Sequence, residues 1–455
     1  MPIQSKNPAT EEVVKTFEEI SDQELEQKLA KAVSAFEAWK KISFTERAKL
    51  FIKLSDYLIE HKNELGQLST LEMGKATSGS GNEIEKSALT CEYFAEQTAA
   101  LLAPVPLSTK ASESFLQFDP LGIILGVMPW NFPYWQVFRG AAPALMAGNV
   151  MVVKHASNVP QCAEAIEQAF IDSGFPIGVY QNLRIGSGRV EKVLRDSRIA
   201  GVTLTGSERA GSEVASIAAS EIKKAVLELG GSDPFIVLPD ADINLACELG
   251  VSSRISNNVG QACNAAKRFI VHEDVLGKFT AMLVEQFKNI KVGDPTNPET
   301  QMGPLATEQI LKDLEKQVSE SVSQGAKIAV GGHRLGTKGY FYEPTVLTDV
   351  TPTMPVFREE VFGPVAAVIS FTTEDEAVSL ANDTPYGLGA TIMTQKIPQA
   401  KKLASRLDVG NVFVNAQVRS DPRAPFGGIK RSGYGRELGE VGIKEFTNIK
   451  TVWIA

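Results

Sequence analysis

The sequence predicts an α/β protein with two domains, each built on a parallel β-sheet, and a small additional β element. From Leu121 onward, short apolar runs alternate with helical stretches, as in repeated β-α-β units whose strands pair in parallel. The alternation occurs twice, on either side of Gly230 and Gly231, and a chain of 455 residues accommodates two or three domains. We therefore place a domain boundary near this glycine pair.

The segment 22–102 is predicted to be helical, because apolar side chains recur in it every three or four residues. Ser21 and Asp22 can cap the first helix, and two further helical runs are expected over 45–65 and 78–102. In the first alternating set, strands are expected at 122–127, 150–154, 182–185, 201–204 and 225–229, and helices at 133–146, 160–173, 190–195 and 210–219.

The second alternating set follows the glycine pair. Its expected strands are 234–238, 268–272, 327–330, 365–371, 390–393 and 411–414, and its expected helices include 244–255, 276–289, 310–324 and 374–382. Two β-prone segments, 108–118 and 447–455, lie outside both sets. Because lone strands are unstable, we expect these segments to pair with each other or with a neighbouring subunit.

Composition and motif searches exclude several classes of protein. A formal net charge of −8 argues against a nucleic-acid or anionic-membrane partner. The longest apolar stretch, Leu121 to Trp130, is about half of what a membrane span needs. The four histidines lack zinc-ligand spacing, so no metal site is expected. The first residues lack an apolar signal core, which favours a cytoplasmic protein with reduced thiols.

The four cysteines are far apart and do not suggest a disulfide framework. Cys91, Cys162 and Cys247 lie in predicted helices and are interpreted as packing residues. Cys263 differs, because it ends the glycine-containing segment Asn258-Val-Gly-Gln-Ala-Cys263. We expect a loop-to-helix entry there, at which the helix dipole and backbone N–H groups would lower the pKa of the thiol.

Six motifs, in order along the chain, together resemble those of the aldehyde dehydrogenase superfamily. They are Pro129-Trp-Asn131-Phe-Pro133, Leu204-Thr-Gly206-Ser207 with Gly211, Val226-Leu-Glu228-Leu-Gly-Gly231, Asn258-x-Gly260-Gln261-x-Cys263, Glu360-Val-Phe362-Gly-Pro364 and Pro425-Phe-Gly-Gly428. The resemblance implies a Rossmann-variant cofactor-binding domain of residues 1–103 and 122–230, and a catalytic domain of residues 231–425. Residues 104–121 and 426–455 would form a bridging element, and the assembly would be a homodimer or homotetramer.

The resemblance also assigns the chemistry. Cys263 would attack an aldehyde as a thiolate, and the Asn131 amide with the Cys263 backbone N–H would stabilise the oxyanion. Hydride transfer to a nicotinamide would leave a thioester, which Glu228 would hydrolyse as the general base for water. Two structural alternatives stay open: Glu228 is a surface residue that ends a strand, and Asn131 caps the helix that begins near Pro133.

NADP is the predicted cofactor, with NAD as the alternative. In the family, the strand that ends at Lys154 presents the adenosine ribose, and Ser157 stands where NAD-preferring members commonly carry glutamate. Serine removes a charge that would repel a 2′-phosphate, and Lys154 can pair with that phosphate. Ser157 could instead cap the helix that starts near Pro160. The other cofactor contacts carried over are Trp130, Gly206, Ser207, Gly211, Glu360 and Phe362.

The predicted substrate is succinic semialdehyde, which would be oxidised to succinate. Arg139 follows Asn131 by eight residues, about two helical turns, and an arginine there can clamp a carboxylate. This pattern and the segment 415–423 resemble the shorter, NADP-linked succinic semialdehyde dehydrogenases of bacteria, with Trp135, Arg419 and Ser420 as further substrate contacts. Asn257 departs from other semialdehyde dehydrogenases, which carry an arginine at that position.

Several alternatives stay open for the function. Arg139 could instead be a structural ion-paired residue. The enzyme could also accept a broad range of aldehydes, transfer its acyl group to coenzyme A, or be catalytically silent.

Overall fold

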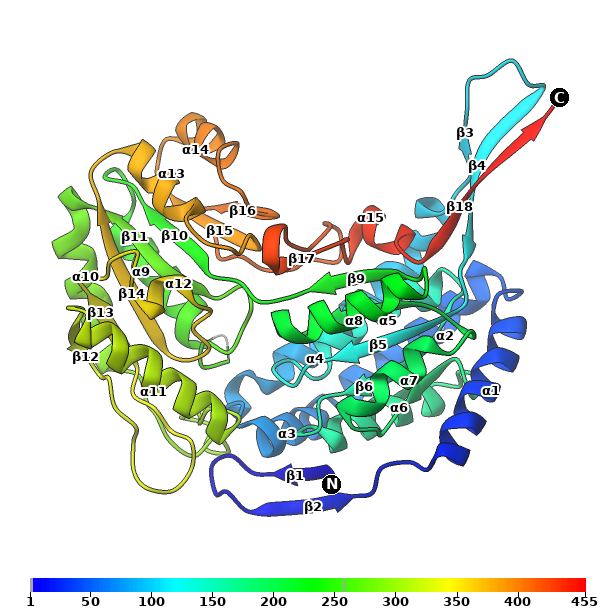
Figure 1. The fold of residues 1–455 in the computed structure, drawn as a ribbon, viewed down its shortest axis with the longest axis horizontal. Helices are drawn as coiled ribbons and strands as arrows, with labels where there is room; N and C mark the ends of the chain where they lie inside the picture. The colour runs from blue at the N-terminus through cyan, green and yellow to red at the C-terminus, as the bar shows by residue number, and fades with distance from the viewer. Residues whose placement is uncertain (1–2, 257) are drawn as a thin grey trace.

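The computed structural model describes residues 3–256 and 258–455. Two α/β units lie side by side, and a long β arm projects from one of them (Figure 1). A short hairpin of β1 (Ile3–Lys6) and β2 (Val13–Phe17), which the sequence analysis did not predict, precedes the first helix.

Four helices follow the hairpin instead of the three predicted helical runs. They are α1 (Asp22–Trp39), α2 (Phe44–Glu60), α3 (Lys62–Met73) and α4 (Thr77–Leu101). Ser21 and Ser43 begin the first two with capping boxes. The single run expected over 45–65 is wrong, because His61 (φ −94°, ψ 12°) leaves helical geometry and separates α2 from α3.

The first large sheet has the strand order β17-β9-β8-β5-β6-β7. Its strands are β5 (Ile123–Met128), β6 (Val150–His155), β7 (Tyr180–Asn182), β8 (Ile199–Thr205), β9 (Lys224–Glu228) and β17 (Gly433–Tyr434). The connecting helices are α5 (Trp135–Met146), α6 (Pro160–Asp172), α7 (Val190–Arg195) and α8 (Glu208–Ser220). All pairs are parallel except β17 with β9, so the C-terminal segment adds one antiparallel edge strand to the sheet that was predicted to be parallel.

The order of the strands reverses between β5 and β8. The chain runs outward from β5 to β7 and then returns to the other side of β5 as β8. In open α/β sheets, ligands bind at the carboxyl ends of the strands where the order reverses. The segments that follow β5 and β8 are those that contain Asn131 and Gly206.

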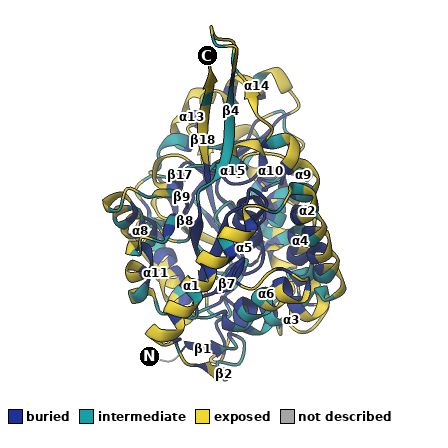
Figure 2. Cartoon of the chain, turned by 90° about the vertical axis from the view of Figure 1, so that its right-hand side faces the viewer, coloured by how far each residue is buried: buried dark blue, intermediate teal, exposed yellow. Residues whose placement is uncertain are grey.

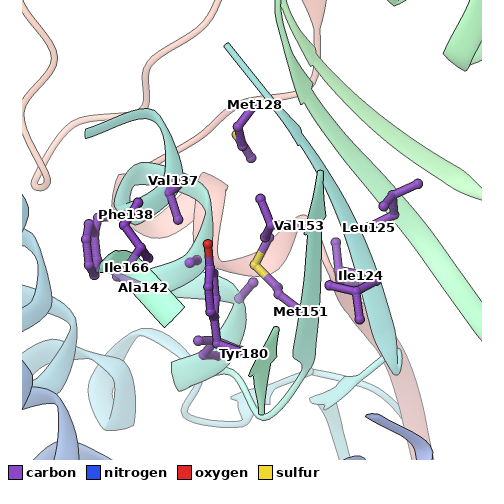
Figure 3. Close-up of a cluster of buried hydrophobic side chains, with 14 of the residues drawn as sticks. Ile124, Leu125, Met128, Val137, Phe138, Ala142, Met151, Val153, Ile166 and Tyr180 are labelled. Atoms are coloured by element: carbon purple, nitrogen blue, oxygen red, sulfur yellow. The ribbon is translucent and has the colours of Figure 1, made fainter. Parts of the chain in front are cut away.

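Apolar side chains fix α5 and α6 on this sheet (Figure 3). Phe170 of α6 stacks between Phe138 of α5 and Tyr180 of β7, with ring centroids 5.8 and 4.4 Å apart. Other members of this cluster are Ile124, Leu125, Met128, Val137, Ala142, Met151, Val153 and Ile166. The close packing sets the position of α5, which carries Trp135 and Arg139.

The second large sheet has the strand order β12-β13-β14-β11-β10-β15-β16. Its strands are β10 (Asp233–Val237), β11 (Ala266–His272), β12 (Lys327–Val330), β13 (Thr345–Thr348), β14 (Val365–Phe371), β15 (Gly389–Met393) and β16 (Asn411–Val414). The remaining helices are α9 (Ile243–Val251), α10 (Glu273–Lys288), α11 (Glu308–Ser323), α12 (Pro355–Arg358), α13 (Glu374–Asn382), α14 (Ile397–Ala404) and α15 (Gly439–Lys444). Only β12 pairs in antiparallel fashion, and β13 was not predicted.

The arm confirms the prediction that the two isolated β-prone segments pair with each other. β4 (Glu113–Pro120) and β18 (Thr447–Ile454) form an antiparallel ladder, and β3 (Val105–Pro106) adds to the far side of β4. The arm stands out from the body, and its residues are mostly intermediate or exposed (Figure 2). The limits of the three predicted domains stay a prediction.

Candidate active site

The predicted nucleophile and the predicted base lie where the two large sheets meet. Glu228 is the last residue of β9, and Cys263 lies in the turn just before β11, the neighbour of β10. A Cβ atom added to Gly231 would lie 2.8 Å from the carbonyl oxygen of Cys263, so the two backbone segments approach closely only because residue 231 is a glycine.

Two expectations about Cys263 are wrong. The residue lies in a turn before a strand and not at a helix entry, so no helix dipole acts on it. Burial raises the pKa of its thiol to about 12, and the Glu228 charge acts in the same direction, whereas Arg139 and Lys267 oppose the shift. The packing role predicted for Cys91, Cys162 and Cys247 is confirmed, because all three are buried.

The loop before the nucleophile has an unusual backbone. Asn258, Val259 and Gly260 follow one another with φ between 60° and 70°, a conformation that a β-branched residue such as Val259 rarely adopts. The buried Arg254 guanidinium donates hydrogen bonds to the carbonyl groups of Gly260 (3.1 Å) and Val361 (2.7 Å), which ties the loop to the segment after α12. The surrounding structure thus holds the strained loop in place.

A cavity of about 250 Å³ opens beside Cys263. The parts of the chain that line it include the first turns of α4, the start of α5, the nucleophile loop and the segment 417–420, together with Gln301, Gly303 and Phe426. Of the residues predicted for catalysis or substrate binding, those in its lining are Cys263, Trp135, Arg139, Arg419 and Ser420. Asn131 and Glu228 are not part of this lining.

Asn131 contacts the nucleophile loop. Its side-chain amide donates a hydrogen bond to the carbonyl of Gln261 (3.0 Å), and its own carbonyl accepts one from the Asn258 side chain (2.6 Å). The alternative that Asn131 caps a helix is wrong, because α5 begins after Tyr134. The Glu83 carboxylate instead accepts hydrogen bonds from the first backbone N–H groups of α5, those of Tyr134 (2.8 Å) and Trp135 (3.0 Å).

Glu228 is buried, which rules out the alternative that it is a surface residue. Burial raises the pKa of its carboxyl to about 8, Glu437 adds to the shift and Arg139 opposes it. One carboxylate oxygen accepts a hydrogen bond from Arg139 Nη2 (3.3 Å). A carboxyl with this pKa can hold or release a proton near neutral pH, as a general base must.

Arg139 is an ion-paired residue, as one of the two interpretations of the sequence proposed. Its buried guanidinium pairs with Glu228 and Glu437 and donates a hydrogen bond to the Thr205 hydroxyl (3.1 Å). Burial alone would lower the pKa of Arg139, but the two carboxylates outweigh it and the net shift is upward. The guanidinium also lines the cavity, so it contributes positive charge there while it binds Glu228.

Sequence reasoning missed three charged residues of this region. Lys86 of α4 lines the cavity, and Lys267 is buried with its ammonium 2.7 Å from the carbonyl oxygen of Cys263. Glu437 is the buried partner of Arg139. Lys267 follows Cys263 by four residues, and Glu437 lies in a glycine-rich segment, so both had a local signal. Lys86 had no such local signal. Its helix also carries exposed charged residues such as Glu85, and the sequence alone does not distinguish Lys86 from them.

The residues predicted to contact the cofactor's adenosine, Lys154 and Ser157, lie at the carboxyl end of β6. Lys154 is buried near the end of β6, which lowers its pKa, although Glu19 opposes the shift. Within the described ranges, no carboxylate lies within 4 Å of its ammonium. Ser157 is exposed and does not cap α6, which begins after Val159, so the capping alternative is wrong.

The N-terminus of α8 follows β8 at the reversal of strand order. Ser207 caps the helix by accepting a hydrogen bond from the Ala210 N–H (3.3 Å), and Gly206 precedes it. Gly211 permits close packing, because a Cβ atom there would lie 2.6 Å from Leu229. A helix N-terminus with free N–H groups is a suitable site for a diphosphate.

Three further cofactor candidates lie between the two sheets. Glu360 accepts a hydrogen bond from the Gly231 N–H (2.9 Å), and its carboxylate lies 3.9 Å from the Lys267 ammonium. The rings of Trp130 and Phe362 meet edge to face, with centroids 5.9 Å apart. Asn257, the position at which the sequence departs from other semialdehyde dehydrogenases, lies outside the described residues.

The described ranges hold neither a metal-binding cluster nor a helix that could span a membrane. No group of three or more histidine, cysteine or acidic side chains there could hold a metal ion. None of the helices in those ranges is long and apolar enough to cross a membrane.

Comparison with known proteins places these features in one family. The model of the aldehyde dehydrogenase family matches residues 1–452. A probable succinate-semialdehyde dehydrogenase (NADP+) from Synechocystis is 50% identical over 455 residues, and succinate-semialdehyde dehydrogenase (NADP+) 1 from Mycobacterium tuberculosis is 49% identical over 458, both with full coverage of each chain. The crystal structure of the succinic semialdehyde dehydrogenase of Streptococcus pyogenes with NADP+ is 37% identical, with a TM-score of 0.97 over 99% of both chains.

Proposed function

The chain belongs to the aldehyde dehydrogenase family, and from this premise we propose that it oxidises succinic semialdehyde to succinate with NADP as the hydride acceptor. The observation that carries the proposal is the cavity beside Cys263, in which the cationic side chains of Lys86, Arg139 and Arg419 gather. Such a cavity favours an aldehyde that carries a carboxylate. The names of the relatives at about half identity support the same substrate and cofactor.

The reaction begins at the Cys263 thiol. Because its pKa is raised to about 12, the thiol needs a proton acceptor as its sulfur attacks the aldehyde carbon, and the Glu228 carboxylate is the buried base of the site. The carbonyl oxygen becomes an oxyanion during the attack. The Asn131 amide and the Cys263 backbone N–H are the donors that would stabilise this charge.

Bound NADP would supply the acceptor for the hydride that the carbon attached to sulfur loses. The acyl group is then held on Cys263 as a thioester. Glu228 first releases to solvent the proton that it took from the thiol. It then takes a proton from water while the water oxygen attacks the thioester carbon; the carbon–sulfur bond breaks, the Cys263 sulfur takes up this proton, and succinate leaves. The charge of Arg139, which lies beside both Glu228 and the cavity, favours the ionised form of Glu228.

The residues at the end of β6 fit NADP. The Lys154 ammonium supplies a positive charge, and the exposed Ser157 offers a hydroxyl where a glutamate would repel a 2′-phosphate. Trp130, Gly206, Ser207, Gly211, Glu360 and Phe362 complete the proposed cofactor contacts.

The Ser157→Glu variant tests this cofactor assignment. We expect the wild type to prefer NADP in kcat/KM, and the variant to lose at least about tenfold of that preference, because the new carboxylate repels the 2′-phosphate. Steady-state kinetics with NADP and NAD on both proteins measures the effect. A wild type that prefers NAD by more than about tenfold would contradict the assignment.

Assembly and location are part of the proposal. The arm exposes several apolar side chains, among them Ile449, Trp453 and Ile454, which supports a homodimer or homotetramer that forms through the arm. The four cysteines are free, and a thiol nucleophile needs a reducing compartment, which supports a cytoplasmic location.

A further inference from the structure

Lys86 is a lysine of α4 whose side chain enters the cavity beside Cys263. Its ammonium donates a hydrogen bond to the Ser420 hydroxyl (2.8 Å) and lies 4.0 Å from the centre of the Trp135 ring. Trp135 belongs to α5, and Ser420 to the lining segment 417–420. Lys86 therefore joins three parts of the chain that line the cavity: α4, α5 and the segment 417–420.

The direction of this side chain is fixed by its own helix. Glu83, one turn earlier on α4, is buried, forms an ion pair with Lys75 and binds the first two N–H groups of α5. Residues three positions apart share a face of a helix, so Lys86 also faces α5 and the cavity. The ammonium is thus held at the wall of the cavity by packing that does not depend on a ligand.

The charge of Lys86 has no close counter-ion. Across the residues 3–256 and 258–455, no carboxylate lies within 4 Å of its ammonium. Asp421 is the carboxylate that raises the pKa of Lys86, and it is itself held by Arg423 in two hydrogen bonds of 2.6 and 2.8 Å. The other groups that act on Lys86 are Arg139, Arg419 and Cys263. Arg139 is already paired with Glu228 and Glu437, whereas within the described residues neither Lys86 nor Arg419 forms an ion pair. Of these two cations, Lys86 is the one that also binds the Ser420 hydroxyl.

We propose that the Lys86 ammonium, together with the Ser420 hydroxyl, binds the carboxylate of succinic semialdehyde and determines the preference for ω-carboxyl aldehydes. The inference rests on the proposed function and adds a residue that the sequence did not indicate. Lys86 supplies the charge for recognition, whereas Arg139 acts mainly on Glu228. The Trp135 ring under the ammonium leaves one side of the cation open to the substrate.

The environment of Lys86 adds a pH signature. Burial lowers its pKa to about 7, and Arg139 and Arg419 contribute to the shift, whereas Asp421 and Cys263 oppose it. Only the protonated amine attracts a carboxylate, so recognition of an anionic aldehyde weakens as the pH rises through about 7. A neutral aldehyde of the same length, butanal, should show no such loss, whereas the titrations of Cys263 and Glu228 affect both substrates alike.

The test compares the wild type with Lys86→Met, Lys86→Arg and a control, Lys62→Met. Lys62 is the first residue of α3 and pairs with the exposed Glu85 of α4. Its replacement therefore removes a positive charge close to α4 from a residue that does not line the cavity. KM and kcat are measured with succinic semialdehyde and with butanal at saturating NADP. We expect Lys86→Met to raise KM for succinic semialdehyde at least about tenfold and to leave KM for butanal within about twofold.

The pH profile gives a second, independent readout. In the wild type, the ratio of kcat/KM for succinic semialdehyde to that for butanal should fall above about pH 7. In Lys86→Arg, whose guanidinium stays charged, the ratio should stay flat to about pH 9. If Lys86→Met also loses butanal turnover through misfolding, the pH profile of Lys86→Arg still tests the role of Lys86. A ratio that falls above about pH 7 in Lys86→Arg as in the wild type would overturn that role.

The outcomes separate the inference from the function on which it rests. A wild type that prefers succinic semialdehyde, with an unchanged preference in Lys86→Met, overturns the role of Lys86 alone. A wild type with equal kcat/KM for both aldehydes overturns the proposed substrate and the role of Lys86 together. A tenfold loss in Lys62→Met as well would show a general charge effect and would also overturn the assignment.

Discussion

At the scale of one residue, burial gives the Glu228 carboxyl a pKa that suits a general base. The carboxyl has a pKa raised to about 8, first by burial and then by the neighbouring Glu437. A general base works only when deprotonated, so kcat should rise with pH through about 8. The same rise is expected with succinic semialdehyde and with butanal, because it belongs to the chemistry and not to carboxylate recognition.

Measurement of kcat between about pH 6 and pH 10 checks this expectation. The Glu228→Gln variant should lose the rise and lower kcat by about 10²–10⁴-fold. Its fold can be verified by the retention of NADP binding. A wild-type kcat that is flat across this range, or an active Glu228→Gln enzyme, would show that another group activates water.

The sequence indicated most of the individual residues but not their environments. Cys263, Asn131 and Glu228 stand in ordered motifs, and the structure brings all three to the junction of the two sheets. The thiol pKa was predicted in the wrong direction, because a turn before a strand offers no helix dipole and burial dominates. Lys86 and the pairing of Arg139 with Glu437 depend on contacts across hundreds of residues, which local patterns do not contain.

The contact between α4 and α5 is the feature at the element scale that shapes the cavity. The Glu83 carboxylate forms an ion pair with Lys75 and accepts hydrogen bonds from two backbone N–H groups at the start of α5. Replacing it by alanine leaves a buried lysine without its partner, at a cost of about 3–5 kcal/mol. We expect Glu83→Ala to lower the melting temperature by several degrees and to weaken succinic semialdehyde binding, since Trp135 and Lys86 face each other across this contact.

Differential scanning calorimetry tests this prediction by comparing the melting temperature of Glu83→Ala with that of a matched variant, Glu85→Ala. Glu85 is two residues away on α4, exposed, and paired with Lys62, so Glu85→Ala should cost only about 0–1 kcal/mol. Equal melting temperatures for the two variants would mean that the buried contact does not stabilise α5.

The periodicity of apolar residues predicted most helices and strands, but it failed where tertiary contacts determine where an element begins or ends. The strand expected at 182–185 is found at Tyr180–Asn182, because after Leu183 the chain leaves the sheet although Leu183 and Ile185 are buried. The helical run over 45–65 is divided at His61, a residue with no strong helix-breaking signal. The edge strand β17 comes from a segment of only two residues, too short for any pattern.

At the scale of the whole molecule, the arm is a surface with exposed apolar side chains and an edge strand that pairs with no further strand in the described part of the chain. β18 is an exposed edge strand whose apolar side chains include Trp453, 56% exposed, and Ile449, 55% exposed. Edge strands of this kind pair readily with another chain. We expect the wild type to be a dimer or tetramer and Trp453→Lys to shift it toward single chains.

Light scattering after gel filtration measures this shift. Ile222→Lys is the control, because Ile222 is also an exposed apolar residue (93%) but lies far from the arm in sequence. An Ile222→Lys protein that dissociates equally, or a wild type with the mass of one chain, would contradict the proposed role of the arm.

The division into two sheets explains why the site lies between them. The carboxyl ends of β5, β6, β8 and β9 present Glu228 and most of the proposed cofactor residues. Cys263 precedes β11, and Glu360 and Phe362 precede β14, both strands of the second sheet. Neither unit holds the proposed machinery alone. The β-α-β alternation predicted both units, but their relative placement follows from close backbone contacts such as that of Gly231 with Cys263.

The central claim is that this chain oxidises succinic semialdehyde with NADP through Cys263. The most direct measurement is the rise of NADPH absorbance when purified wild type and Cys263→Ala are given NADP with succinic semialdehyde or butanal. We expect the wild type to form NADPH with a kcat/KM at least about tenfold higher for succinic semialdehyde, and Cys263→Ala to form none. No NADPH from the wild type, or equal rates in the two proteins, would contradict the claim.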